Sequence, residues 1–392
     1  MLEFDDIIAP LTREKFFADY WTRSFLAAKG TPGRFAGLLG WDELNAILEQ
    51  HRLSPPRFRL SNGGQALEPL QYMSPGPGGL AQLNPGKLAA CLSGGATLVL
   101  DCVEELAPRV RGLAASFREA LHAGNYVNLY AGWHSQNGLD LHWDSQEIMV
   151  LQVAGRKRWQ VFAPTRRNPL PDDSEAPPRP TAPPAWDGML EDGDMLYIPR
   201  GWWHVAFPVG EPSLHLTVAT IPPHGFDLLH WLVGRLRSHE AVRTDLPRLD
   251  DPRGQAAYLK ALRPLLAEAL SDDAIAEFRH EWEGDLRPFP HVCLPDMPYA
   301  QAETLSDAHR IRLAAAHHLH FVNDGATMAF KAHGIMWGGL PPTLVPPLEK
   351  LRDTDAMSFA ELCAGLSEAE IAHLRHTLAA LARGGVVQIE KP

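Results

Sequence analysis

The sequence predicts a fold that is mainly β with added α-helices: an antiparallel barrel or sandwich of the jelly-roll type, followed by helical segments. Six short runs of strand-forming residues lie between residues 125 and 221, namely NYVNLYAGW, EIMVLQV, KRWQVF, DMLYIP, HVAFPV and SLHLTVATI. Turn residues separate almost all of them, and many short strands divided by glycine and proline are typical of jelly rolls. After residue 222 the apolar spacing becomes helical.

Length and composition indicate a globular chain of two or three domains. The 392 residues exceed the size of one ordinary core, and 45% hydrophobic with 21% charged residues excludes wholesale disorder. The formal net charge of −11 disfavours general affinity for nucleic acids and favours a basic partner. Solubility alone is the alternative explanation of the same charge.

The N-terminal sequence and the cysteines favour a cytoplasmic protein. MLEFDDIIAPLTREKFF lacks the basic, apolar and small-residue sections of a signal peptide, and no apolar run approaches the length of a membrane span. The four cysteines are far apart in the sequence: Cys91, Cys102, Cys293 and Cys363. This spacing suits a reducing compartment and makes a cysteine-based zinc site a poor hypothesis.

Residues 1–222 are expected to form the barrel domain. The first 120 or so mix helical stretches such as WDELNAILEQHR with loops rich in glycine and proline, and they identify no reaction. Eight prolines between residues 164 and 184 predict an extended surface excursion. Because strands resume after it, the excursion lies within the barrel and is not a domain boundary.

Residues 223–300 are expected to form a helical domain. Apolar residues recur at helical spacing in FDLLHWLVGRLRSHEAVR, and GQAAYLKALRPLLAEAL continues the pattern. Two strongly amphipathic segments beside a complete barrel offer more apolar surface than a small domain readily buries, which predicts a homodimer. Packing of these helices on the barrel is the alternative.

Residues 301–392 are expected to form a winged-helix-like domain. Two capping boxes, Ser358 with Glu361 and Ser367 with Glu370, each open a short helix, and ARGGVVQIE then turns into a strand. A packing or dimerisation module is the alternative reading of this small pattern.

A candidate metal site comes from His142, Asp144 and His204. Residues i and i+2 of a strand share a face, so His142 and Asp144 point the same way. His204 follows sixty residues after Asp144, in EDGDMLYIPRGWWHVAF. Two histidines and one carboxylate, with no thiolate, form the facial set of non-haem Fe(II) oxygenases, which leaves positions for a bidentate cosubstrate and O₂. A zinc hydrolase needs a general base besides, and no HExxH helix is present.

A Fe(II) oxygenase of this type also needs a buried cation for the distal carboxylate of 2-oxoglutarate. Lys157 lies fifteen residues after His142, at the start of the strand that follows the Ala-Gly turn, and can supply it. By strand alternation Arg156 and Arg158 fall on the opposite face. A solvated hairpin charge is the alternative for Lys157. Asn128 and Tyr130 share one strand face and can hydrogen-bond the same cosubstrate, or serve as ordinary polar core residues.

Taken together, these motifs resemble the JmjC-type ribosomal oxygenases, which are cupin-fold protein hydroxylases dependent on Fe(II) and 2-oxoglutarate. The residues that carry the resemblance are His142-x-Asp144, Lys157, GDMLYIPRGWWH and SLHLTV, within about residues 120–220. The resemblance implies a double-stranded β-helix (JmjC) barrel, then a helical dimerisation domain and a winged-helix-like end. Outside residues 120–220 it is weaker.

The resemblance also implies roles for individual residues. It makes His142, Asp144 and His204 the iron ligands and Lys157 the partner of 2-oxoglutarate, with Asn128 and Tyr130 lining the pocket. His215 and Thr217 in SLHLTV are expected to face the same cavity, with Thr217 binding cosubstrate. Bacterial members that act on a ribosomal-protein arginine often have arginine where this chain has Lys157, whereas histidine hydroxylases of the eukaryotic branch have lysine, so the target residue stays open.

The expected substrate is a basic protein, above all a ribosomal protein, and no sequence-specific contact with nucleic acid is expected. A peptide natural-product precursor is the alternative within the same reaction class. A cupin metal isomerase or hydrolase would use the same ligands and ignore 2-oxoglutarate. A non-enzymatic regulator, with a ligand-binding barrel and a C-terminal binding module, is the remaining alternative.

Overall fold

The computed structural model describes residues 2–134, 137–170, 173, 178–286, 292, 294, 300–314, 319, 321–352, 354 and 356–390. The chain divides into two compact units, Met1–Pro222 and Pro223–Pro392. The first unit ends where the strands give way to helices. The separate boundary near residue 300 stays a prediction, and Cys293 lies outside the described residues.

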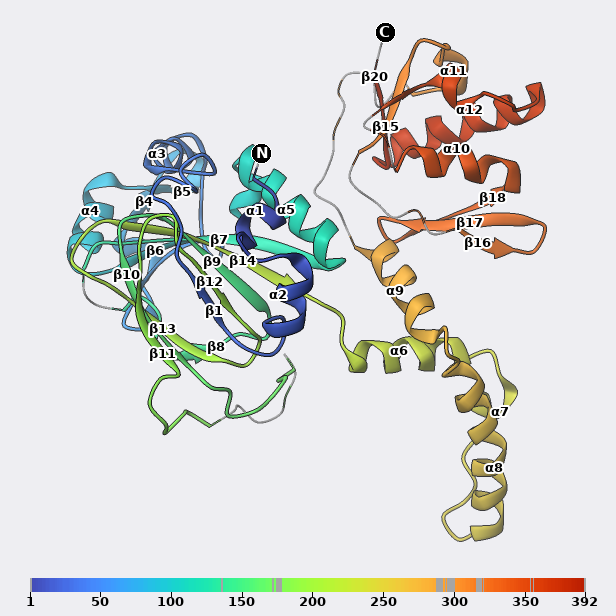
Figure 1. Cartoon of the computed structure of the whole chain (residues 1–392), viewed down its shortest axis with the longest axis horizontal. Helices are drawn as coiled ribbons and strands as arrows, with labels where there is room; N and C mark the ends of the chain where they lie inside the picture. The colour runs from blue at the N-terminus through green and yellow to red at the C-terminus, as the bar shows by residue number, and fades with distance from the viewer. Residues whose placement is uncertain are drawn as a thin grey trace. The chain divides into compact units, whose positions relative to one another are not determined.

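The first unit is built on two antiparallel sheets (Figure 1). The larger sheet has eight strands, in the order β1 (Leu26–Ala28), β12 (Met195–Ile198), β9 (Glu147–Ala154), β14 (Ser213–Ile221), β7 (Gly124–Gly132), β6 (Thr97–Leu100), β2 (Phe58–Asn62) and β3 (Gln65–Ala66). The smaller sheet has four strands, in the order β11 (Trp186–Leu190), β10 (Lys157–Phe162), β13 (Trp203–Pro208) and β8 (His142–Trp143).

The barrel core forms where the two sheets face each other. Apolar side chains of the larger sheet, among them Ile148, Leu196 and Ala219, pack against Trp159 and Val161 of the smaller sheet. All six predicted runs are strands, and the predicted mixed fold with a jelly-roll-type barrel is confirmed.

The connections follow local sequence chemistry. The turn between β9 and β10 contains Gly155 with φ of +64°, where a Cβ atom would lie 2.1 Å from the carbonyl oxygen of Pro212, so the position requires glycine. The proline-rich stretch joins β10 to β11, which are neighbours in one sheet. It is therefore an excursion within the barrel, as the return of strand patterns after it predicted.

Helices pack against the outer face of the larger sheet. The helices of this unit are α1 (Phe4–Ile8), α2 (Arg13–Asp19), α3 (Trp41–Gln50), α4 (Pro85–Ser93) and α5 (Pro108–Leu121), with the 3₁₀ turns η1 (Pro69–Gln71), η2 (Pro77–Gly79) and η3 (Val103–Glu105) and the hairpin β4 (Met73–Pro75) and β5 (Ala81–Leu83). Phe4, Phe16 and Phe117 from α1, α2 and α5 form an aromatic cluster, and Phe16 contacts Tyr197 of β12 edge to face at 5.1 Å. This cluster fixes the N-terminal helices to the barrel.

The second unit combines helices with two small sheets. Its helices are α6 (Gly225–Leu236), α7 (Glu240–Arg243), α8 (Pro252–Ala269), α9 (Ala274–Asp285), α10 (Val345–Lys350), α11 (Phe359–Leu362) and α12 (Glu368–Arg383), with the 3₁₀ turns η5 (Ala302–Thr304) and η6 (Pro342–Leu344). The sheets are β19 (Met357–Ser358), β15 (Arg310–Leu313) and β20 (Val387–Glu390), and β16 (Phe321–Asp324), β17 (Thr327–Ala332) and β18 (Ile335–Leu340).

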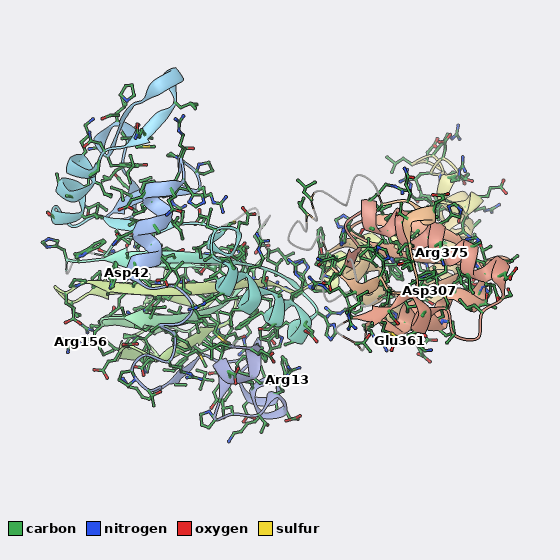
Figure 2. The ribbon with its side chains drawn as sticks, turned by 90° about the horizontal axis from the view of Figure 1, so that it is seen from above. Arg13, Asp42, Arg156, Asp307, Glu361 and Arg375 are labelled. Atoms are coloured by element: carbon green, nitrogen blue, oxygen red, sulfur yellow. The ribbon has the colours of Figure 1, made fainter. Side chains whose placement is uncertain are left out.

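The C-terminal part of this unit has its own apolar core, which includes Phe330, Phe359 and Leu378. Both predicted capping boxes are present, at the starts of α11 and α12, and β20 follows α12, so the helix, helix, strand order holds. Figure 2 labels Arg375 and Asp307 in this part, whose charged groups lie 3.5 Å apart. No helix in the described ranges has the length and hydrophobicity needed to cross a bilayer.

Candidate active site

The structure brings His142, Asp144 and His204 together at one end of the barrel. His142 in β8 pairs directly with His204 in β13, and Asp144 follows β8. The distance from Nε2 to the Asp144 carboxylate is 3.4 Å for His204 and 3.9 Å for His142. One ligand atom from each residue lies within 4.8 Å of the other two, which is close enough for a single metal ion.

Backbone carbonyls hold both imidazoles in the orientation that suits a metal. His142 Nδ1 lies 2.7 Å from the carbonyl oxygen of Asp140, and His204 Nδ1 lies 3.1 Å from that of Trp202. A carbonyl oxygen only accepts hydrogen bonds, so each Nδ1 carries the proton and each Nε2 keeps its lone pair. Metal-binding histidines are commonly oriented in this way.

The protonation states also suit coordination. Burial, followed by the nearby His204, lowers the pKa of His142, so its ring is neutral at pH 7. Burial alone would raise the pKa of Asp144, but the two neighbouring histidines outweigh it, and this pKa is lowered. The site therefore offers the imidazole nitrogens of two histidines and one carboxylate, the donor set that non-haem Fe(II) prefers.

A pocket runs from this triad into the barrel. Its lining residues are Thr97, Tyr130, Gly138, Leu139, His142, Asp144, Ile148, Lys157, Trp159, His204, Ala206, Pro208, His215 and Thr217. The side chains of His142 and Asp144 are 37% and 31% exposed, whereas Lys157 and Thr97 are buried. The pocket thus opens on the triad side and is closed at the Lys157 end.

Lys157 is a buried amine at the closed end. It is 3% exposed, whereas its neighbours Arg156 and Arg158 point to solvent and pair with Glu211 and Asp187; Figure 2 labels Arg156. Burial lowers the pKa of Lys157 to about 7. Among the residues that the structure describes, no carboxylate pairs with this amine, so the closed end is suited to receive an anion.

His215 is the direct neighbour of this lysine, a contact that sequence reasoning left without a role. The Lys157 ammonium donates a hydrogen bond of 3.2 Å to His215 Nδ1. The imidazole stacks on Tyr130, with ring centroids 4.9 Å apart and an interplanar angle of 11°. Burial, followed by the charge of Lys157, lowers the pKa of His215, so the ring stays a neutral acceptor. The alternation of SLHLTV places His215 in the cavity, but it does not reveal this pairing.

Tyr130, Thr217 and Asn128 occupy neighbouring positions of the same sheet. Tyr130 pairs with His215 across β7 and β14, and Asn128 pairs with Thr217. Tyr130 and Thr217 line the pocket. Asn128 hydrogen-bonds the Tyr130 side chain and accepts a bond of 3.2 Å from the backbone N–H of Cys102. The contacts of Asn128 thus show it holding the Tyr130 side chain in position.

The loop before His142 closes one wall of the pocket and was not anticipated from the sequence. Ser61 Oγ donates to the carbonyl oxygen of Gly138 at 2.6 Å, and the backbone N–H of Gly64 donates to the same oxygen at 3.1 Å. A Cβ atom on Gly138 would lie 2.3 Å from the Thr97 hydroxyl, so this close approach needs glycine. In the sequence, the glycine in HSQNGLDLH was the one sign of this close approach.

Comparisons with known proteins agree with this architecture. A family model described as JmjC domain matches residues 108–228. Ribosomal oxygenase 1 of Rattus norvegicus is 27% identical over 317 residues, which are 71% of this chain and 51% of that protein. The protein named bifunctional lysine-specific demethylase and histidyl-hydroxylase NO66 of Drosophila persimilis is 30% identical over 215 residues, 54% of this chain and 31% of that protein. The chain therefore spans about a third to a half of the length of these relatives.

Among solved structures, YcfD of Escherichia coli, described as a ribosomal oxygenase in complex with cobalt and 2-oxoglutarate, aligns with a TM-score of 0.61. The alignment covers 97% of this chain and 99% of that chain at 17% sequence identity, which shows a shared fold. Over residues 108–228 the chain therefore matches the JmjC domain, and it is homologous to ribosomal oxygenase 1 and NO66.

Proposed function

We propose that this chain is a dioxygenase dependent on Fe(II) and 2-oxoglutarate that hydroxylates a side chain of a protein, most simply a ribosomal protein. One observation carries the proposal: a pocket with a His-Asp-His triad at its open end and a buried lysine, without an anionic partner among the described residues, at its closed end. The names of the relatives and of the YcfD structures support the same reaction class.

The residues present fit both groups. The two Nε2 lone pairs and the Asp144 carboxylate suit Fe(II), and the ammonium of Lys157 suits the distal carboxylate of a dicarboxylic acid. When bound, Fe(II) and 2-oxoglutarate together activate O₂ for insertion into an unactivated C–H bond. The protein contributes orientation and electrostatics.

Each pocket residue has a definite task in this proposal. Lys157 holds the far end of 2-oxoglutarate, and the Tyr130 hydroxyl and Thr217 hydroxyl offer hydrogen bonds along its length. His215 holds the lysine in place. The apolar side chains of Ile148 and Trp159 keep water from the interior. The partly exposed His142 and Asp144 leave the open end for the substrate.

The proposed substrate class is a basic ribosomal protein. The net charge of −11 favours encounter with a chain rich in lysine and arginine at low salt. Some 170 residues beyond the barrel suit the docking of a polypeptide more than that of a small metabolite. A cytoplasmic location and independence from specific nucleic-acid contacts belong to the same proposal.

We expect one protein of the ribosome to carry an added oxygen that depends on this enzyme. Intact masses of ribosomal proteins are compared between cells with the wild-type chain and cells with His142→Ala. The first readout with purified protein is succinate formation from 2-oxoglutarate with Fe(II), alone and then with the candidate substrate. Oxygen gained by a free metabolite, with no change in any protein or peptide, would refute the substrate class but not the oxygenase.

We also expect a homodimer held together by the helices of the second unit. Large apolar side chains are exposed along two of these helices, namely Phe226, Leu229 and Val233 on α6, Leu259 and Leu266 on α8, and Leu270 at the C-terminal cap of α8. Such rows are typical of surfaces that a partner covers. Light scattering is expected to give twice the monomer mass at micromolar concentration, and Leu229→Asp with Val233→Asp to give the monomer mass. A wild-type monomer would exclude the dimer.

A further inference from the structure

A buried carboxylate lies outside the pocket, beside the segments that carry the metal ligands. Glu147 begins β9, three residues after Asp144, and is 2% exposed. Its neighbour Ile148 lines the pocket, and successive side chains of a strand point to opposite faces. Glu147 therefore faces away from the pocket, toward the helix-covered face of the larger sheet, and does not contact reacting groups.

Glu147 is held by two donors. The Tyr197 hydroxyl donates a hydrogen bond to Glu147 Oε2, and the backbone N–H of Arg200 donates to the same carboxylate. The Tyr197 oxygen in turn accepts a bond of 2.8 Å from the backbone N–H of Thr22. The ring of Tyr197 stacks on Trp21, with centroids 5.8 Å apart. The carboxylate is thus anchored to the N-terminal segment on one side and to a backbone turn on the other.

That turn connects two of the three metal ligands. The N–H of Gly201 donates to the carbonyl oxygen of Asp144 at 2.9 Å, and the N–H of Trp202 closes the turn onto Pro199 at 3.1 Å. The carbonyl of Trp202 is the acceptor that orients the imidazole of His204. Through the N–H of Arg200, the Glu147 carboxylate therefore holds the residues on which the positions of both Asp144 and His204 depend.

Burying a carboxylate at this position is energetically unfavourable. Burial raises the pKa of Glu147, although the bonds from Tyr197 and Arg200 act in the opposite direction. An apolar side chain of similar size would avoid the cost of removing a carboxylate from water. It would, however, leave the N–H of Arg200 without its acceptor.

We infer that Glu147 is a positioning residue, which fixes the turn of residues 199–202 against Asp144 and so keeps the three ligands at coordinating distance. This inference rests on the proposed role of the triad as metal ligands. Tyr197 is a positioning residue of the same kind, because it orients the Glu147 carboxylate and links it to the N-terminal segment through Thr22.

The test is to titrate the purified chain of 392 residues with Co(II) and to monitor binding through the d–d absorption bands of the bound metal. Glu147→Ala is expected to weaken Co(II) binding at least about tenfold, as is usual when a supporting contact of a metal site is lost, and to alter the absorption bands. Glu147→Gln keeps an oxygen acceptor for the Arg200 N–H and is expected to lose clearly less. Tyr197→Phe is expected to weaken binding several-fold.

Glu104 provides the matched control. It is a buried carboxylate in η3 that accepts a bond of 2.9 Å from the backbone N–H of Val127, and Val127 lies in β7, which carries none of the three proposed metal ligands. Glu104→Ala is expected to lower the melting temperature while leaving Co(II) affinity unchanged. If Glu147→Ala does not fold, Glu147→Gln and Tyr197→Phe decide the question.

Three results would overturn the inference: wild-type Co(II) affinity in the Glu147 and Tyr197 variants, an equal loss in Glu104→Ala, or a glutamine variant as weak as alanine. Each of these leaves the proposed oxygenase intact. A wild-type chain that binds no Co(II) would instead remove the metal role of the triad, and this inference with it.

Discussion

Alanine in place of His142, Asp144 or His204 is expected to abolish turnover and to weaken metal binding by more than about 100-fold. Loss of a directly coordinating atom exceeds the effect of losing a supporting contact, which is typically 10- to 100-fold. Because His142 and Asp144 are about a third exposed, their removal is expected to change the free energy of unfolding by no more than about 1 kcal/mol. His204 is buried, so its substitution is expected to cost more stability.

Titration with Co(II) and succinate formation with Fe(II) measure the two effects separately, and a melting curve reports the fold. His224→Ala is the matched control, because His224 lies 2.8 Å from Asp227 in a histidine–aspartate pair outside the barrel. This variant is expected to bind Co(II) as the wild type does. Full activity after substitution of any one of the three residues would show that the triad is wrongly assigned.

The strands of the barrel could be predicted because each is a local pattern. The apolar run at residues 148–151 of β9 matches the burial of that strand, and Lys157 was separated from Arg156 and Arg158 by strand alternation alone. The pairing of His142 with His204 is different in kind, because the two residues are 62 positions apart and their register depends on the sheet. Composition and spacing could identify these residues as candidates, but they could not predict that the two lie side by side.

Backbone acceptors and remote supports left no signal in the sequence. The carbonyl groups of Asp140 and Trp202 orient the imidazoles, yet any residue type supplies a carbonyl. The role of Glu147 depends on Tyr197, fifty residues later, and on a turn whose path the sequence does not specify. The sequence of the N-terminal segment likewise indicated no reaction, because this segment contributes packing around Phe16 and support of the barrel.

Lys157→Ala is expected to weaken the binding of 2-oxoglutarate by about 2 to 4 kcal/mol while leaving metal affinity nearly unchanged. Removing one partner of a desolvated charge pair costs this much, and it corresponds to roughly 30- to 1000-fold in Kd. Lys157→Met keeps the aliphatic length without the charge and separates loss of the amine from creation of a cavity. Arg156→Ala, one residue earlier and exposed, is the matched control and is expected to bind 2-oxoglutarate normally. An unchanged Kd in Lys157→Ala would rule out the anchor.

The pH dependence of the same binding tests the charge directly. In the free protein the pKa of Lys157 is about 7, so the amine is largely protonated below pH 7 and largely neutral above it. Binding of a carboxylate requires the protonated form, and above pH 7 each bound ligand must bring a proton onto the lysine. Affinity is therefore highest below pH 7 and is expected to fall as pH rises through it, by up to about tenfold per pH unit. Arginine stays charged throughout this range, so Lys157→Arg is expected to bind with a flat profile, and a wild-type profile as flat as that of arginine would show that this lysine is not the group that meets the ligand.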